Sequence, residues 1–406
     1  MDRIAIRING KEIEALKGSR ISEVIPAQGE HGYDSDPIVA AAVNGIARSL
    51  SERLEGNAEI KPIHLFSRNG LRAYRKSLCF LLSYATSVIA PERTLIIGHS
   101  LGDGYYFRYR DGRKGDRDRL EEVMRSAIEK DIPFEIVELT AEEALAYSKE
   151  HLLTETESLL STINDGSYRF VRLGECMEVY YEPLLPSAGY LERWELREYE
   201  DGLLLRYPQS RDPFTIKPFS DNPLLFSVFQ ENKKFARILS IESLGDLNRK
   251  IADGTLPETI RLSETLQRKR ISDAAEDIRR RDKVKAVFIA GPSSSGKTTF
   301  SMKLTDELIA YGYECMRISL DDYYHEGDRI PLDEDGNKDF EVLESLNLEL
   351  FRKQLSDLLE GKDVRLARHS FRSKKTLFDE KASRMNEHTV LIIEGIHGLN
   401  PELCPD

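Results

Sequence analysis

A glycine- and serine-rich turn carries the most specific chemical signal in the sequence. Residues 287–299 read VFIAGPSSSGKTT, which fits the phosphate-binding loop pattern G-x-x-x-x-G-K-[ST]. Glycines let backbone N–H groups converge on phosphate oxygens, and the helix that follows adds partial positive charge at its N-terminus. The pattern predicts a nucleotide-binding set formed by Gly291, Ser293, Ser294, Ser295, Gly296, Lys297, Thr298 and Thr299.

Two residues at the end of this loop have distinct expected roles. Lys297 should reach the β- and γ-phosphates of ATP, and the Thr298 hydroxyl should ligate Mg²⁺. ATP and Mg²⁺ are therefore the predicted cofactors. The alternative is a turn that only links a strand to a helix, but the apolar run before the loop and the amphipathic segment after it favour phosphate binding.

Two acids stand where apolar segments end. Asp321 follows the segment 313–320, and Glu394 follows the run VLII. Because ligands of parallel sheets bind at the carboxyl ends of the strands, Asp321 is predicted to accept a proton from an attacking hydroxyl. Glu394 is predicted to order Mg²⁺ and its waters. Each could instead be an ordinary acid in a strand-end loop.

Elements that would position these groups alternate along the C-terminal part of the chain. Apolar strand-like runs at 284–290, 313–320 and 390–393 are separated by helical patterns from Lys297 onward and over 342–359. This alternation predicts a parallel α/β sheet over 284–406.

The upstream part divides into three further predicted segments. Residues 1–65 are β-rich, 66–230 mix helices and strands, and 231–283 look like a helical linker. Within the second segment, Thr140 with Glu143 forms a capping-box pattern that predicts a helix start. Residues 261–285 hold nine Lys/Arg and five Asp/Glu, which fits either a connecting helix with a solvated face or a surface that faces phosphate or RNA.

Composition limits the function classes. The 406 residues include 58 Lys/Arg and 70 Asp/Glu, a net charge of −12, which argues against a basic nucleic-acid coat or membrane-surface protein over the whole chain. The four cysteines are scattered, which fits a reducing compartment. The longest mostly apolar run, 78–90, is shorter than the roughly 20 residues of a membrane span. A cytoplasmic protein without a membrane partner is expected, and the oligomeric state stays open.

The segments GPSSSGKTT, DDYY and IIEGI together resemble the uridine kinase branch of the uridine kinase/phosphoribulokinase family. The resemblance implies ATP-dependent phosphorylation of the 5′-hydroxyl of a uridine- or cytidine-like nucleoside, with Asp321 and Lys297 as catalytic residues. It also implies nucleoside contacts by Tyr324, Phe340, Glu341, His369 and Phe371. Glu341 stands where the family usually has Asp. His369 and Phe371 could alternatively be ordinary strand residues.

Only 109 residues follow Lys297. The resemblance implies an arginine-bearing lid and further sheet strands beyond the IIEGI segment, which this sequence lacks. The kinase domain is therefore expected to be incomplete, with slow or absent turnover.

The N-terminal half has a resemblance of its own. Residues 1–65 resemble a TGS-type ubiquitin-like domain, and 66–230 resemble the second additional, editing-type domain of threonyl-tRNA synthetase on IGHSLGDGYYF and PSAGY. Lys76 and Phe80 occupy the positions of that domain's H-x-x-x-H pair, and Tyr180 and Leu184 those of its Cys and His. Zinc needs such ligands, so the module is predicted to bind or regulate and not to deacylate.

The predicted fold class is a multidomain chain of α+β and α/β parts. It comprises an N-terminal ubiquitin-like β-grasp, a synthetase-editing-like α+β domain and an incomplete P-loop kinase domain with a parallel sheet. The predicted function is nucleoside phosphorylation. The alternatives are an RNA-binding regulatory protein, whose N-terminal half recognises tRNA-like RNA and whose P-loop acts as a switch, and a kinase of another small hydroxylated metabolite. The sequence leaves the preferred nucleoside open.

Overall fold

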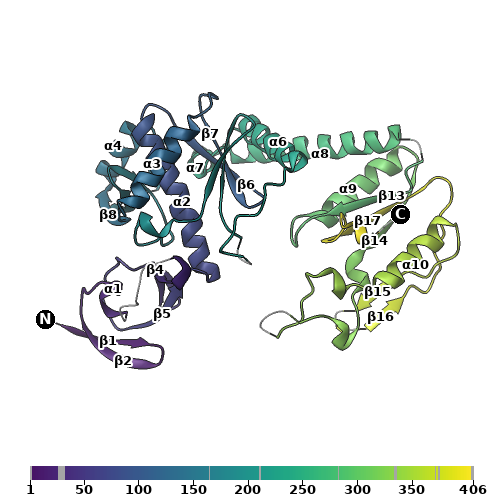
Figure 1. Ribbon diagram of the computed structural model, residues 1–406. Helices are drawn as coiled ribbons and strands as arrows, with labels where there is room; N and C mark the ends of the chain where they lie inside the picture. Colours follow the sequence, from purple (N-terminus) through teal and green to yellow (C-terminus); the bar gives the residue numbers. More distant parts are fainter. Residues whose placement is uncertain are drawn as a thin grey trace. The chain divides into compact units, whose positions relative to one another are not determined.

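A computed structural model describes residues 2–25, 33–163, 165–209, 212–281, 283–332, 336–370, 372–373 and 375–403. The chain divides into two compact units between Pro257 and Glu258 (Figure 1). Each unit contains hydrophobic clusters of its own. The predicted mixture of α+β and α/β parts is confirmed. No helix among the described residues combines the length and apolar character that crossing a bilayer requires.

The N-terminal part of the first unit is a five-stranded sheet with the order β2-β1-β5-β3-β4. Its strands are β1 (Arg3–Ile8), β2 (Lys11–Leu16), β3 (Ile38–Val43), β4 (Ile46–Ser49) and β5 (Ala58–His64), and the short helix α1 spans Ile21–Val24. Alternate isoleucines of β1 are buried, as their period of two requires. Asn9 and Gly10 both have positive φ, which is the geometry of a tight hairpin turn between β1 and β2.

A long buried helix, α2, organises the remainder of the first unit. It spans Arg68–Ile89, and the apolar residues along its middle are fully buried in the largest hydrophobic cluster. Two antiparallel sheets accompany it, with the orders β11-β12-β7-β6 and β10-β9-β8. Their strands are β6 (Leu95–Leu101), β7 (Gly104–Tyr109), β8 (Glu135–Thr140), β9 (Ser167–Leu173), β10 (Cys176–Glu178), β11 (Glu195–Tyr199) and β12 (Gly202–Arg206).

Helices of the first unit connect and cover these strands. They are α3 (Arg117–Glu129), α4 (Ala141–Glu150), α5 (Thr154–Leu160), α6 (Pro223–Leu239) and α7 (Leu244–Ala252). The predicted capping box at the start of α4 is confirmed, because the Thr140 N–H donates to the Glu143 carboxylate at 2.8 Å and the Thr140 hydroxyl accepts from the Glu143 N–H at 3.3 Å.

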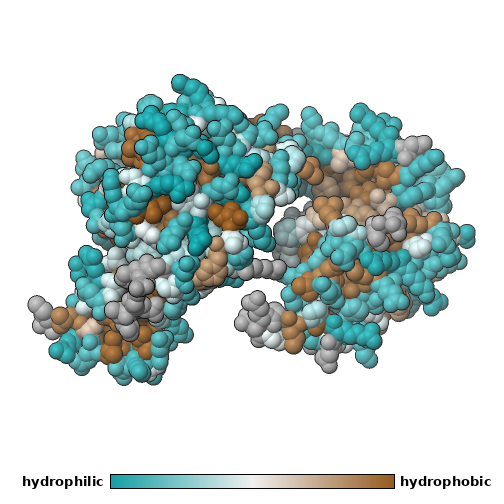
Figure 2. Space-filling model, viewed as in Figure 1, coloured by the Kyte–Doolittle hydropathy of each residue, from teal (hydrophilic) through white to brown (hydrophobic). Residues whose placement is uncertain are grey.

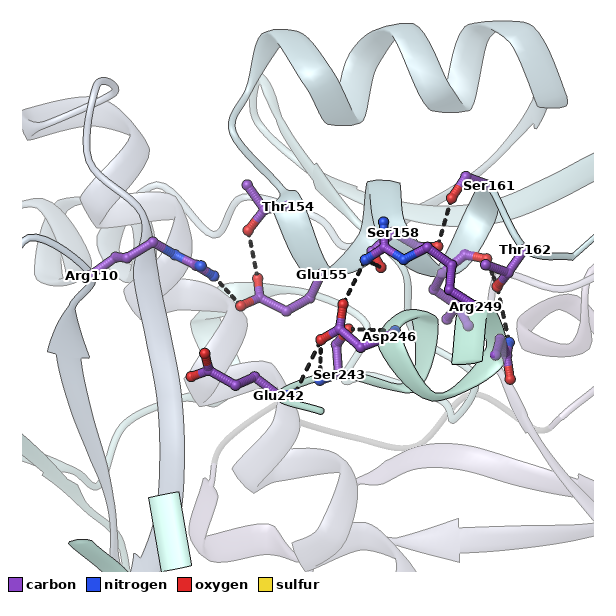
Figure 3. A network of polar contacts seen from close by, with 12 residues as sticks. Arg110, Thr154, Glu155, Ser158, Ser161, Thr162, Glu242, Ser243, Asp246 and Arg249 are labelled. Atoms are coloured by element: carbon purple, nitrogen blue, oxygen red, sulfur yellow. Dashed lines mark hydrogen bonds and ion pairs between the residues drawn. The ribbon is translucent and has the colours of Figure 1, made fainter. Parts of the chain in front are cut away.

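Helix α7 packs against α5 mainly through polar contacts (Figure 3). Arg249 donates to Ser158 Oγ at 2.8 Å and pairs with Asp246, and Asn248 donates to Thr162 Oγ1 at 2.9 Å. Gly245 is the buried residue of α7, and a Cβ there would lie 2.6 Å from the backbone nitrogen of Leu159. Close approach of the two helices therefore depends on the missing side chain.

The second unit contains a parallel three-stranded sheet with the order β13-β17-β14, which confirms the predicted sheet. Its strands are β13 (Ala286–Ala290), β14 (Glu314–Ser319) and β17 (Thr389–Gly395), and its helices are α8 (Leu256–Arg280), α9 (Lys297–Ala310) and α10 (Leu348–Leu359). Apolar residues of α8 and α9 cluster with one face of β17, and those of α10 cluster with the other. The central strand β17 is buried on both sides, as parallel strands usually are.

Two features of the second unit were not predicted from the sequence. The first is a hairpin formed by β15 (Ala367–Ser370) and β16 (Lys375–Phe378). The second is an apolar groove of about 540 Å³ beside β13, lined in part by Phe288, Leu304 and Leu399. Figure 2 shows a hydrophobic patch over α9 and β13.

Substituting Gly245→Ala should loosen α7 from α5, because the added methyl group meets backbone atoms that cannot turn away. We expect a loss of about 1–3 kcal/mol of local stability, the usual cost of overpacking. Hydrogen exchange of the α7 amides measures it. Gly56→Ala is the matched control, since a Cβ at Gly56 meets nothing within 4 Å. Equal exchange in both variants would contradict the packing argument.

Candidate active site

The predicted phosphate-binding loop joins the end of β13 to the start of α9. Ser294 and Gly296 have φ of 60° and 86°, so the backbone takes two left-handed steps before the helix begins at Lys297. Gly296 is the N-cap, and it has no side chain with which to satisfy the first N–H groups of α9. These donors and the helix dipole suit an oxyanion. The Lys297 ammonium stays close to the loop and donates to the Pro292 carbonyl at 2.9 Å.

The remaining loop residues predicted to bind nucleotide lie on the same turn and the first turn of α9. The Ser295 N–H donates to the Pro292 carbonyl at 3.2 Å, which closes the turn. A Cβ at Gly291 would lie 2.8 Å from Ser295 Oγ, so glycine is what allows this tight closure. Ser293, Ser294, Ser295, Thr298 and Thr299 are exposed, and Lys297 is partly buried.

The central position of β17 brings Glu394 to the loop. Its Oε1 accepts from the Thr298 hydroxyl at 3.2 Å and from the Ser319 hydroxyl at 3.3 Å, although 96 positions separate Thr298 from Glu394 in the sequence. The structure thus brings together the two residues predicted to hold Mg²⁺. A hydroxyl beside one carboxylate fits this ion, which prefers hard oxygen ligands and keeps several waters and substrate phosphates.

Asp321 lies at the same edge of the sheet. In the parallel register Ser319 of β14 stands opposite Glu394, and Asp321 follows two residues later in a short 3₁₀ turn. A Cβ at Gly395 would lie 2.6 Å from the Cβ of Leu320, so glycine lets this turn pack against the end of β17. The Asp321 side chain is exposed and is therefore open to a substrate.

Aromatic side chains gather beside Asp321. The Tyr324 ring meets Phe340 edge-on at 5.2 Å between centroids and His369 at 6.0 Å, and the Tyr324 hydroxyl donates to the Phe340 carbonyl at 3.1 Å. Burial, then the charge of Asp321 and a hydrogen bond with it, raises the pKa of Tyr324 to about 12. Tyr324 therefore stays a neutral phenol at physiological pH.

Of the other predicted substrate contacts, Glu341 is exposed, and its negative charge also raises the pKa of Tyr324. Its N–H donates to the Asp339 carboxylate at 2.8 Å, which fixes the backbone at this point. Phe371 lies outside the described residues. The structure thus brings Tyr324, Phe340 and His369 together with Asp321, and Glu341 lies close to them.

A pair of residues that sequence reasoning missed holds the β15–β16 hairpin against the 3₁₀ turn. The second aspartate of the DDYY segment, Asp322, accepts from the Arg368 guanidinium at 2.8 Å and from the His369 N–H at 3.2 Å. Arg368 also bonds Asp379 at 3.1 Å. Asp322 therefore positions His369 beside Tyr324. The doubled Asp and the Arg directly before His369 were the available signals.

In the first unit, the positions of the resembled metal ligands are filled by other interactions. The Lys76 ammonium pairs with Glu182 at 2.5 Å, the rings of Phe80 and Tyr180 pack at 5.3 Å, and Leu184 is buried in the core. Among the residues that the structure describes, no group of three or more His, Cys, Asp or Glu side chains could hold a metal ion. Ammonium, phenyl and aliphatic side chains do not ligate zinc.

Comparison with known proteins gives a separate answer for each part of the chain. Residues 286–402 match the sequence profile of the Phosphoribulokinase / Uridine kinase family. A solved structure described as a possible uridine kinase from Bacillus stearothermophilus is 22% identical and covers 34% of this chain and 76% of its own, with a TM-score of 0.29. Residues 286–402, which lie in the second unit, are therefore similar to this kinase family.

The N-terminal region is similar to threonine–tRNA ligases. The enzyme of Desulforamulus reducens is 29% identical over 162 residues, which are 39% of this chain and 26% of that enzyme. Threonine–tRNA ligase 2 of Bacillus subtilis is 29% identical over 164 residues, 39% of this chain and 25% of that enzyme. The chain spans about a quarter of the length of these curated relatives.

Substituting Arg368→Ala should release the β15–β16 hairpin from the turn that carries Asp321. Because the Arg368 side chain is 47% exposed, we expect its ion pairs to contribute only about 1 kcal/mol. Hydrogen exchange of the amides in 367–370 and 375–378 should rise, while the P-loop amides should not change. Lys303→Ala, which removes an exposed cation of α9, is the control. Unchanged hairpin exchange would show that Arg368 is not its anchor.

Proposed function

We propose that the second unit transfers the γ-phosphoryl group of ATP to the 5′-hydroxyl of a uridine- or cytidine-like nucleoside. The observation that carries this proposal is the parallel register of β17 with its two neighbours. That register gives the P-loop, the Thr298–Glu394 pair and Asp321 one common edge of the sheet. The match of 286–402 to a kinase family supports the reaction class.

In this proposal the loop holds the triphosphate and the two oxygen ligands hold the metal. The backbone N–H groups before and within the first turn of α9 face the phosphate oxygens, and Lys297 neutralises the charge of the β- and γ-phosphates. Thr298, with Glu394 beside it, would hold Mg²⁺, which would supply neutralisation of the charge on the transferred group. Phosphoryl transfer depends mostly on such positioning and charge stabilisation.

Asp321 is the proposed general base. Its exposed carboxylate accepts the proton of the attacking hydroxyl as the new O–P bond forms and the bond from phosphorus to the leaving ADP oxygen breaks. Tyr324 lies close enough for the charge of Asp321 to raise the pKa of its phenol, so the carboxylate and the aromatic side chains share one site.

A nucleoside is favoured over a sugar phosphate because the wall beside Asp321 is aromatic. Phe340, which is 37% exposed, and the partly buried His369 offer ring surface to a flat base, and the buried Tyr324 packs edge-on against both. Glu341 could accept hydrogen bonds from ribose hydroxyls, and Phe371 is proposed as a further base contact. A surface built for a second phosphate group would instead need cations at this position.

The Asp321→Asn variant should lose phosphoryl transfer and keep nucleotide binding. Removing a general base lowers the rate by about 10²–10⁴-fold. Transfer of labelled γ-phosphate from ATP to uridine, cytidine and a panel of other nucleosides measures the rate, and a fluorescent ATP analogue measures binding. Asp306→Asn, on the exposed face of α9, is the matched control.

Two outcomes would contradict this assignment. Equal rates of phosphoryl transfer by the parent chain and the Asp321→Asn variant would show that Asp321 is not the general base. Transfer to a sugar phosphate in preference to every nucleoside would support the kinase reaction but contradict the proposal that the substrate is a nucleoside.

We propose RNA binding as a second candidate function, because the N-terminal region is similar to threonine–tRNA ligases and 261–285 has a basic surplus. Folding leaves this net surplus unchanged, but it engages some of the cations in ion pairs. Three arginines at the end of α8 pair with acids of the same helix, Arg279 and Arg280 with Glu276 and Arg281 with Asp277. The binding would therefore be weak and strongly dependent on salt.

If RNA is a ligand, the affinity for bulk tRNA should fall steeply between about 50 and 200 mM salt, because each phosphate contact releases counterions. Fluorescence anisotropy with labelled tRNA measures the slope. Replacing Arg268, Lys269 and Arg270 together by Gln should make this salt dependence shallower, by the amount expected for the loss of about three phosphate contacts. No binding at the lowest salt would exclude this function.

A further inference from the structure

A cavity of about 470 Å³ lies in the first unit, whereas the P-loop belongs to the second. The C-terminal half of α2, strand β6, helix α4 and strand β10 contribute its walls. Its volume falls in the range of about 300–1,000 Å³ that is typical of small-molecule sites. Neither the proposed kinase reaction nor RNA binding uses it.

A carboxyl group faces this cavity from β10. Glu178 is held by hydrogen bonds with the Ser83 and Tyr180 hydroxyls, and both Glu178 and Ser83 line the cavity. Two hydroxyl donors leave lone pairs of a carboxylate unused, since it offers about four acceptor positions. The group can therefore accept further N–H donors from a ligand.

Among the described residues, no basic side chain acts on the Glu178 carboxyl group. The titratable groups that face Glu178 are Cys79 on α2, Cys176 on β10, Tyr147 on α4, Tyr180 after β10 and Glu155 on α5, and none of these is basic. Burial therefore raises the pKa of Glu178 to about 7. A buried acid without a basic partner is the complement of a cationic ligand.

The rim of the cavity has the same sign of charge. Glu175 and Glu242 are exposed acids at its edge, and Glu155, which also lines the cavity, pairs with Arg110 (Figure 3). Arg93, which also lines the cavity, directs its guanidinium to Asp111, with hydrogen bonds of 3.0 and 2.9 Å. The field at the mouth attracts cations.

The walls between floor and rim are aromatic and apolar. Tyr147 and His151 stack at 4.0 Å between centroids with an interplanar angle of 19°, and Ile96, Ile97 and Met177 line the cavity beside them. Such walls take up an aromatic or aliphatic body, and a few polar groups fix its orientation.

We propose that this cavity binds a small organic amine with an aromatic or apolar body, whose ammonium group contacts Glu178. The aromatic part packs against the Tyr147–His151 pair, and the rim acids guide the cation inward. The site is separate from the phosphoryl-transfer site, so the proposal does not rest on the kinase reaction.

Calorimetric titration of the whole chain with tyramine and with tyrosol tests this proposal. The two probes share the phenol ring and differ in an ammonium against a hydroxyl. We expect tyramine to bind at least about tenfold more tightly, because a charge-assisted hydrogen bond is about twice as strong as a neutral one. Glu178→Gln should remove most of this preference, while Glu150→Gln, on the exposed end of α4, should keep it.

Three outcomes would overturn the proposal. They are equal affinities for the two probes, no binding of tyramine up to about 10 mM, and an unchanged preference in Glu178→Gln. If Glu178→Gln does not fold, Ile97→Trp serves instead, because Ile97 is 45% exposed and a larger side chain there fills the mouth without touching the acid. Unaltered tyramine binding by a folded Ile97→Trp variant would overturn the proposal equally.

The affinity for tyramine should also rise with pH through about 7 and then level off. Below the pKa of Glu178 the cation must displace a proton from the carboxyl group, and above it the carboxylate is already charged. His151 would repel the cation when protonated, so the profile is compared with that of His151→Gln. A flat profile in that variant would show that Glu178 does not receive the cation.

Discussion

The position of β17 between β13 and β14 is the constraint on which the candidate active site depends. All three strands are parallel, so their carboxyl ends meet at one edge, and a register shift of one residue would turn Glu394 away from Thr298. The register is strongly specified because β17 is apolar and buried on both faces. Glycine is needed at this edge where a side chain would clash with a neighbouring segment, as a side chain at Gly395 would with Leu320. Hydrophobic packing thus fixes the geometry of the charged groups.

Much of this arrangement could be predicted from local patterns. The P-loop has a fixed spacing, and Asp321 and Glu394 each stand at the end of an apolar run. The sequence therefore predicts which residues form the site and at which edge of the sheet they lie. The strand order β13-β17-β14 could not be predicted from the sequence. β17 comes last in the chain, and its own residues do not indicate which strands it pairs with. The β15–β16 hairpin was missed because ARHS and KTLF are only four residues long and show no alternation of apolar and polar residues. Its anchor at Asp322 depends on a contact across 46 positions.

The first unit contains a long buried helix, but side chains that cannot bind zinc occupy the positions where the domain that it resembles has its metal ligands. Helix α2 remains the buried axis, and Phe80 and Tyr180 pack together at positions where the resembled domain has metal ligands. Further along the same helix, Ser83 forms a hydrogen bond with Glu178 in the wall of a cavity. The cavity could not be found from sequence because its residues come from α2, β6, α4 and β10, which are far apart in the chain. The spacing of apolar residues predicts single helices and strands, but it does not predict a cavity that lies between them.

Helix α7 has a consequence for the mechanics of the chain. Its docking depends on Gly245 and on hydrogen bonds, while Leu244 and Ile251 remain exposed, so it buries little apolar surface. Segments of this kind open at a lower free energy than a packed core. A residue advances about 1.5 Å along a helix and about 3.3 Å in an extended chain. Melting α7 alone would therefore roughly double the span of this segment just before α8, giving the two units a longer tether while each stays folded.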